Sequence, residues 1–278
     1  MHHLRSICTP ALKSVISIIL CVCCSFGFNL NAQDLDTQDL DTHDLDTQNL
    51  DTNALRRAIS GPDRDVTDFV RDDARKPVEL LDWLGLQPGM TVLDMYAAGG
   101  YYTFILAKAV GPQGIVYAQN TPRGLEFEED RQEITQGEAL DNKIRRGNLT
   151  NVTQIVRPLE EIGLAENSLD MIIVAQTLHD WYNPNPERAL TRLLLLKALL
   201  QPGGVIGIED HIGVPGRDNR DMHRMETQQA IDVSLQAGFT VESSELLRSL
   251  GDDHMRAIFD PRLNRNTDRF LLKLVKPL

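Results

Sequence analysis

The chain has 278 residues, of which 42% are hydrophobic, and its formal net charge at pH 7 is −12. This length and composition suit one globular domain with a substantial core. The acidic balance argues against nucleic acid as a partner, because binding to its phosphate backbone needs clustered Lys and Arg.

Residues 1–32 are predicted to be a secretory signal peptide. A basic start containing Arg5 and Lys13 precedes an uncharged, mostly apolar stretch, Ser14–Phe28, and Ala32 offers a small residue for cleavage. The alternative is a retained anchor, although the stretch is short for the roughly 20 apolar residues that span a bilayer. Cleavage would leave a bacterial periplasmic or secreted protein with no membrane span in the mature chain.

The cysteines support the same interpretation. All four lie within the predicted signal peptide, at Cys8, Cys21, Cys23 and Cys24. The mature chain would therefore contain no disulfide, no thiolate metal site and no cysteine nucleophile.

Residues 33–53 are expected to form an acidic, low-complexity linker. Four copies of a five-residue repeat, QDLDT, QDLDT, HDLDT and QNLDT, carry one Leu each and cannot bury a core. A calcium-binding repeat is the alternative, but the repeat lacks the glycine and the closing Glu of such loops.

Residues 54–278 are predicted to form one α/β domain. A short helix at 55–59 and a charged stretch at 63–75, with Val66, Phe69 and Val70 as its apolar face, precede a helix at Pro77–Leu84. Helices are then expected at Tyr102–Val110, Glu126–Arg146, Pro186–Leu200 and Arg220–Ala237. Strands are expected at Met90–Met95, Ile115–Gln119, Val152–Val156, Met171–Gln176, Val205–Glu209, Phe239–Ser243 and Phe270–Val275.

The alternation of short apolar strands with helices indicates a doubly wound, mostly parallel seven-stranded sheet covered on both faces. The last two strands, joined by a long segment, are expected to be antiparallel. In such a sheet, ligands bind at the carboxyl ends of the strands, near the point where strand order reverses.

The stretch Val92–Tyr102 is the first candidate for a ligand site. Asp94 lies near a strand end, and the small-residue turn Ala97–Gly100 leads to a helix N-terminus with free N–H groups. This order suits a ligand that carries a nucleoside. It differs from the G-x-G-x-x-G of dinucleotide-binding proteins, which place the acid about 20 residues further on.

At this point five motifs, in order, carry a resemblance to class I S-adenosylmethionine-dependent methyltransferases, and especially to exported bacterial proteins known as predicted methyltransferases. They are VLDMYAAGGYYT at 92–103, GIVYAQN at 114–120, SLDMIIVAQTLHD at 168–180, LLQPGGVI at 199–206 and DMHR at 221–224. The resemblance implies a Rossmann-like fold, the cofactor S-adenosyl-L-methionine, and cofactor contacts at Asp94, Ala98, Gly99, Gly100, Asn120 and Gln176.

The sequence also departs from that family. Tyr96 and Ala98 stand where the family has glycines, Asn120 replaces the acid that binds the ribose, and Pro158 stands where an acid often faces the adenine. An amide can still donate and accept hydrogen bonds, but it lacks the charge of a carboxylate.

Three residues are candidates for catalysis. His179 and His211 follow adjacent strands, so either could act as a general base, and Arg224, expected to open the next helix, could hold an anionic substrate. Each could instead be an ordinary hydrogen-bonded loop residue. No metal site is predicted, because the histidines lack the close spacing of zinc motifs.

Two functions follow. The first is methyl transfer from S-adenosylmethionine to a small molecule or an envelope component. The second is a non-catalytic exported binding protein whose methyltransferase pocket has changed its ligand, which the altered loop, Asn120 and Pro158 favour; fold alone does not decide between them. Neither the methyl acceptor nor the oligomeric state follows from the sequence.

Overall fold

The computed structural model describes residues 49–129, 132–248, 251–263 and 265–278. The predicted signal peptide and most of the predicted linker lie outside the described residues. Within the described part of the chain, no helix is both long enough and apolar enough to cross a membrane.

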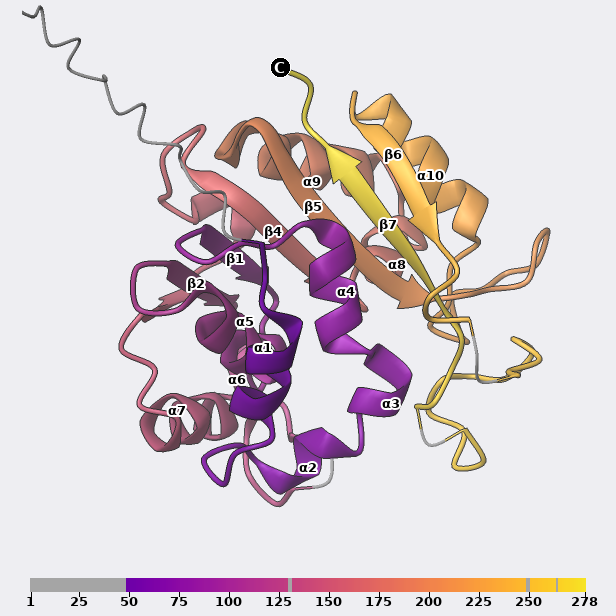
Figure 1. The fold of residues 1–278 in the computed structure, drawn as a ribbon. Helices are drawn as coiled ribbons and strands as arrows, with labels where there is room; N and C mark the ends of the chain where they lie inside the picture. The colour runs from indigo at the N-terminus through magenta and orange to yellow at the C-terminus, as the bar shows by residue number, and fades with distance from the viewer. Residues whose placement is uncertain (1–48, 130–131, 249–250, 264) are drawn as a thin grey trace, which may run out of the picture. The chain divides into compact units, whose positions relative to one another are not determined.

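A seven-stranded sheet forms the centre of the domain, with the order β3-β2-β1-β4-β5-β7-β6 (Figure 1). All neighbouring pairs are parallel except β5–β7 and β6–β7. The predicted fold class is therefore confirmed, including the antiparallel C-terminal strand. The strands are β1 (Thr91–Met95), β2 (Ile115–Asn120), β3 (Val152–Val156), β4 (Leu169–Ala175), β5 (Leu200–His211), β6 (Thr240–Ser244) and β7 (Arg269–Val275).

Helices connect these strands and precede the first of them. They are α1 (Thr52–Ile59), α2 (Val66–Phe69), α3 (Asp72–Arg75), α4 (Pro77–Leu84), α5 (Tyr101–Val110), α6 (Pro122–Leu125), α7 (Gln136–Arg146), the 3-10 helix η1 (Leu159–Glu161), α8 (Leu178–Tyr182), α9 (Pro186–Leu199) and α10 (Thr227–Gln236). Helix α4 has the predicted bounds, since Pro77 suits its first turn and Gly85, at φ +84°, ends it.

The central strands bury side chains on both faces, as a period of two requires. Val92 packs in a core with α1, α4 and α5, whereas its neighbour Leu93 packs in a second core with α8, α9 and α10. Both layers are visible in Figure 1. This double cover explains why the strands read as continuous apolar runs.

Three predicted segments differ in the structure. The helix expected at Glu126–Arg146 begins only at Gln136, as α7, because a capping box between Thr135 and Glu138 starts it there and Glu128 instead pairs with Thr135 in an isolated bridge. The helix expected at Arg220–Ala237 begins only at Thr227, because Met225 pairs with Ile212 beyond the end of β5.

The third is the charged stretch at 63–75, which forms the short helices α2 and α3. Its expected apolar face is not buried: Val66 is 75% exposed, Phe69 37% and Val70 52%. The buried residue of α2 is instead Asp68, which lies 3.2 Å from Lys143 Nζ of α7. The stretch is therefore held by an ion pair rather than by an apolar face.

Candidate active site

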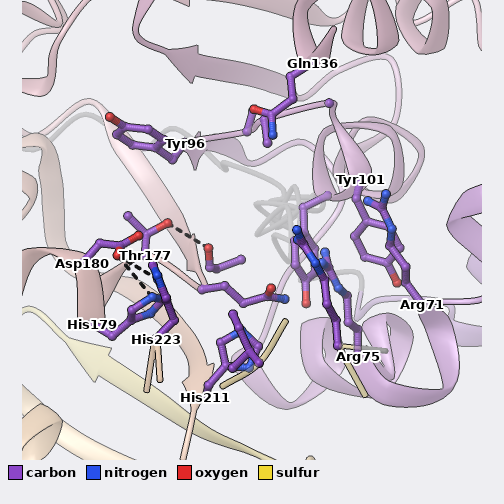
Figure 2. A pocket seen from close by; sticks show the side chains of 18 of the residues that line it. Arg71, Arg75, Tyr96, Tyr101, Gln136, Thr177, His179, Asp180, His211 and His223 are labelled. Carbon is purple, nitrogen blue, oxygen red and sulfur yellow. Dashed lines mark hydrogen bonds and ion pairs between the residues drawn. The ribbon is translucent and has the colours of Figure 1, made fainter. Parts of the chain in front are cut away.

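A cavity of about 480 Å³ opens at the carboxyl ends of β1, β4 and β5, where the strand order reverses. This volume is typical of small-molecule sites. Figure 2 shows Arg71, Arg75 and Tyr101 on one side of the cavity and the histidines on the opposite side, with Tyr96 and Gln136 along a third edge.

The loop after β1 lines this cavity and has an unusual backbone. Tyr96, Ala98 and Gly100 have φ values of +60°, +50° and +84°. The left-handed region costs a residue with a side chain about 1–2 kcal/mol. The loop therefore keeps a glycine-type path at the two positions where the family's glycines are replaced.

Two side chains at the end of β2 hold that path. The N–H groups of Tyr96 and Ala98 donate to Gln119 Oε1 at 3.1 Å and to Asn120 Oδ1 at 2.9 Å. Asn120 Nδ2 also donates to the Ala98 carbonyl at 3.3 Å. Asn120 is 1% exposed and lies outside the cavity lining. The side chain expected to face a ribose therefore supports the loop from behind.

Asp94 is placed as predicted, at the cavity wall, and is only 2% exposed. Thr103 Oγ1 donates to its Oδ2 at 2.6 Å. Burial raises the pKa of Asp94 to about 6, although the hydrogen bonds from Thr103 and the charge of Arg75 act in the opposite direction.

The glycines of the loop have different roles. Gly99 lines the cavity, and a Cβ there would lie 2.1 Å from Glu129 Oε2. Gly100 lies behind the cavity, where a Cβ would come within 2.6 Å of Leu140 Cδ1 of α7. Of the three small residues predicted to contact the cofactor, Ala98 and Gly99 therefore line the cavity, and Gly100 serves turn geometry and packing.

Gln176, after β4, also lines the cavity and has a φ of +52°. Its backbone N–H donates to the Glu209 carbonyl at 2.7 Å, and its Nε2 donates to Glu209 Oε1 at 3.1 Å. Arg269 Nε lies 3.2 Å from the other carboxylate oxygen of Glu209. A buried ion pair thus anchors the β4 end of the cavity.

His179, at the start of α8, lines the cavity and is 3% exposed. Its Nδ1 lies 2.8 Å from Asp210 Oδ1, and its Nε2 lies 3.3 Å from Asp180 Oδ1. Burial alone would lower the pKa of His179, but the charge of Asp210, and then that of Asp180, raises it to about 10. At neutral pH the ring carries a proton on both nitrogens, so the sequence-based role of general base does not suit this geometry.

His211, at the end of β5, has the opposite character. It is fully buried at the cavity wall, with Nδ1 2.6 Å from Thr267 Oγ1 and with no hydrogen-bond partner for Nε2 among the described residues. Burial, followed by the positive charge of Arg269, holds its pKa well below 6.5. The ring is therefore neutral at pH 7.

Arg224 does not reach the cavity. It lies in the turn before α10, is 0% exposed, and its Nη2 lies 2.8 Å from Asp252 Oδ2. Its Nε and Nη1 donate to the carbonyls of Arg256 and Ile212. The expectation that Arg224 opens a helix and holds substrate is corrected: the guanidinium ties three loops together.

Several cavity residues are not predicted as site residues from the sequence, although His223 lies within the DMHR motif. Arg75 of α3 lies over the Tyr101 ring at 4.3 Å, and Arg71 Nη2 donates to Glu129 Oε1 at 2.6 Å. His223 lies in the turn before α10, 5.6 Å from the His179 ring. These residues come from segments before β1 and after β5, so only the tertiary structure places them at the cavity.

The sheet order and the antiparallel β7 are those of class I S-adenosylmethionine-dependent methyltransferases. A methyltransferase domain family matches residues 86–244, more than half of the chain. The chain therefore belongs to this family, and the resemblance carried by its motifs is confirmed.

Individual relatives are distant. A demethylmenaquinone methyltransferase of Staphylococcus aureus is 27% identical over 123 residues, which are 44% of each chain. The chain thus matches less than half the length of that curated relative. A crystal structure of an S-adenosylmethionine-dependent methyltransferase from Aquifex aeolicus has a TM-score of 0.55 at 22% identity, covering 81% of this chain and 98% of its own. This structural likeness concerns the fold.

Proposed function

We propose that the protein transfers a methyl group from S-adenosylmethionine to a small-molecule acceptor. The observation that carries the proposal is one continuous cavity, with the Asp94–Gly99 loop on one side and the histidine wall of His179, His211 and His223 on the other. A donor and an acceptor could therefore share one enclosed space, which methyl transfer in line with the sulfur requires.

The residues present fit the cofactor. Asp94 offers a buried carboxylate, Ala98 and Gly99 offer close backbone approach, and the segment with Gly124 and Phe127 extends the cavity towards α6. The bound cofactor would supply an activated methyl group. The chain then has to orient the acceptor, exclude water and remove any proton that the acceptor loses.

Of the two histidines predicted as a general base, His211 is the better candidate to accept that proton. Its ring is neutral, and its Nε2 is buried without a hydrogen-bond partner among the described residues, whereas His179 already holds its proton. His211→Gln should lower kcat by roughly 10²–10⁴-fold, the usual contribution of a general base, with cofactor affinity unchanged. An unchanged kcat would exclude this role.

The primary test is calorimetric titration of the full chain with S-adenosylmethionine and S-adenosylhomocysteine. We expect binding in the wild type, loss of binding in Asp94→Ala, and normal binding in Asp82→Ala, a matched control at an exposed Asp of α4. The absence of binding by the wild type at millimolar ligand would refute the proposal.

The second candidate, a non-catalytic binding protein, has its own support. Asn120 is committed to Ala98, and the Glu129 carboxylate, paired with Arg71, lies against Gly99 where ligand would approach. If this candidate is right, neither the cofactor nor its demethylated product will bind, although the cavity will still take another small ligand.

We further propose export of the protein by its N-terminal segment to the periplasm or the medium. The support is the sequence pattern of residues 1–32. Expression of the full chain in a bacterium, followed by fractionation and intact-mass measurement, should find residues 33–278 outside the cytosol. A cytosolic full-length product would refute export.

A further inference from the structure

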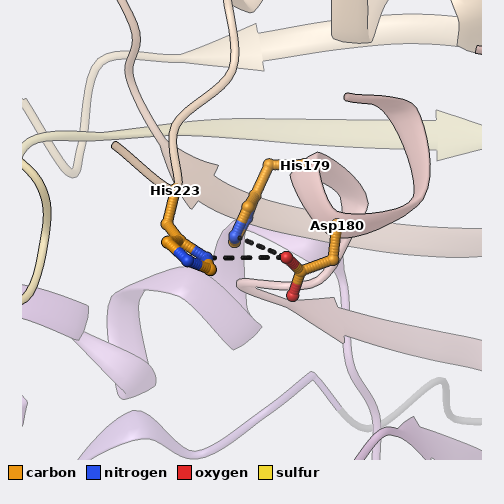
Figure 3. A group of neighbouring side chains, drawn as sticks. All are labelled: His179, Asp180 and His223. Atoms are coloured by element: carbon orange, nitrogen blue, oxygen red, sulfur yellow. Dashed lines mark ion pairs between the residues drawn. The ribbon is translucent and has the colours of Figure 1, made fainter. Parts of the chain in front are cut away.

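A compact group of three potential ligands lies on the histidine wall. His179 and Asp180, neighbours on α8, meet His223 from the turn before α10 (Figure 3). One ligand atom from each residue lies within 4.8 Å of the other two. Because His223 lies 44 positions after His179 in the sequence, no local spacing could indicate the group.

The distances suit a bound ion. His179 Nε2 lies 3.3 Å from Asp180 Oδ1, and His223 Nδ1 lies 3.6 Å from the same oxygen. Two atoms that bind one tetrahedral zinc ion at ordinary bond lengths lie roughly 3.3 Å apart. The His223 and Asp180 side chains are 41% and 57% exposed, so small rotations could bring the third atom pair to the same separation.

The His179 ring is also positioned for ligation, in which the metal ion displaces the proton that Nε2 carries in the metal-free protein. Nδ1 faces Asp210 Oδ1 at 2.8 Å, and the His179 backbone N–H donates to Asp210 Oδ2 at 2.9 Å. Metal-binding histidines commonly have such a carboxylate on the nitrogen that does not bind the metal, since it fixes the ring and directs the other nitrogen. That other nitrogen, Nε2, is buried without a hydrogen-bond partner among the described residues and is aimed at Asp180.

We propose that His179 Nε2, Asp180 Oδ1 and His223 Nδ1 bind one divalent transition-metal ion of the zinc type at the cavity wall. Two imidazoles and one carboxylate favour such an ion over Mg²⁺ or Ca²⁺, which prefer oxygen ligands. Three protein ligands leave an open coordination position, as in catalytic zinc sites. Since all three residues line the cavity, water or a substrate atom can take that position.

The ion would hold an acceptor atom next to the donor, a part of the inference that rests on the proposed function. Metal binding itself does not depend on the proposed function. The site can therefore be tested without any measurement of methyl transfer.

The test measures Zn²⁺ stoichiometry and affinity of the full chain by competition with a chromophoric chelator, with Co²⁺ absorption to report nitrogen ligation. His2, His3 and His43 are present in every variant and contribute a constant background, and the four cysteines of residues 1–32 are blocked by alkylation before the titration. The wild type should bind one Zn²⁺ more than Asp180→Asn or His223→Gln, both at exposed side chains. Asp210→Asn should weaken binding by roughly 10–100-fold through its support of His179.

His254→Gln is the matched control, because His254 pairs with Asp268 outside the group and should bind Zn²⁺ like the wild type. Equal Zn²⁺ binding by the wild type, Asp180→Asn and His223→Gln would overturn the proposal, as would a wild type that binds Mg²⁺ as tightly as Zn²⁺. S-adenosylhomocysteine titration of the same samples separates this outcome from failure of the proposed function.

Discussion

For two residues at and behind the loop after β1, the surrounding groups determine the role of the side chain more than its residue type does. Asp94 is the acid that the family has at this position, but its carboxyl group is buried, and burial raises its pKa to about 6. Asn120 stands where the family has an acid, and its side-chain amide both accepts a hydrogen bond from the Ala98 N–H and donates one to the Ala98 carbonyl. These two bonds hold the strained loop. In both cases the neighbouring groups, and not the side chain alone, set the role.

The pKa of Asp94 predicts a pH-dependent stability. Its folded pKa lies above the ordinary 3.8, so the folded protein keeps a proton here that the unfolded chain releases. The resulting stabilisation is fully present below about pH 4 and is lost as the pH rises through 6. Asp94→Asn, neutral at every pH, should therefore stabilise the ligand-free protein by up to about 3 kcal/mol at pH 8 and by almost nothing at pH 4.

Urea unfolding at the two pH values measures this difference. Asp82→Asn, at an exposed position, should give the same small effect at both. A gain for Asp94→Asn that does not depend on pH would contradict the burial argument.

We expect Asn120→Asp to lower the stability of the protein, although the family pattern suggests that it would strengthen cofactor binding. The substitution restores the expected acid, but it removes the donor to the Ala98 carbonyl and places a buried carboxylate oxygen beside it. We expect destabilisation of about 1–3 kcal/mol and no tighter binding of S-adenosylmethionine. Thermal unfolding and calorimetry would check both, and tighter binding at full stability would show that Asn120 faces the ligand.

Between elements, buried ion pairs assemble the walls of the cavity. Arg269 of β7 lies 3.2 Å from Glu209 of β5, and its Nη1 donates to the Ala74 carbonyl of α3 at 3.0 Å. Lys76 Nζ donates to the Leu246 carbonyl, joining the N-terminal helices to the segment after β6. The site is thus closed by contacts between parts of the chain that are far apart in sequence.

Arg269→Met should destabilise the protein by about 3–5 kcal/mol, because it leaves the buried Glu209 charge without its partner. Adding Glu209→Gln should recover part of that loss, since the amide needs no counter-charge. Denaturant unfolding of both single variants and the double variant measures the coupling. Additive losses would show that the two side chains act independently.

At the scale of the molecule, the sheet was predictable and the site only in part. Alternating apolar strands indicate the fold, and the Asp94 loop is readable from its order of residues. The direction of Asn120, the burial of Arg224 and the approach of His223 to His179 depend on how turns fold against distant strands. Local periodicity carries no information on those contacts.

The position of the cysteines gives a prediction for the whole protein. No cysteine follows Cys24, so a chain cleaved after Ala32 must be stabilised by its core and ion pairs alone. Its unfolding midpoint should be the same with and without a reducing agent. A shift on reduction would mean that residues before Ala32 remain attached.

Part of the cavity wall comes from outside the matched family segment. Residues 86–244 contain the sheet through β6 and the loop after β1, whereas Arg71 and Arg75 precede this segment and Phe259 and Arg265 follow it. A shortened chain ending at Ser244 would keep the five motifs between residues 92 and 224 and lose the side of the cavity that Phe259 and Arg265 line. Both ends of the chain therefore shape the cavity, and a comparison confined to residues 86–244 does not cover them.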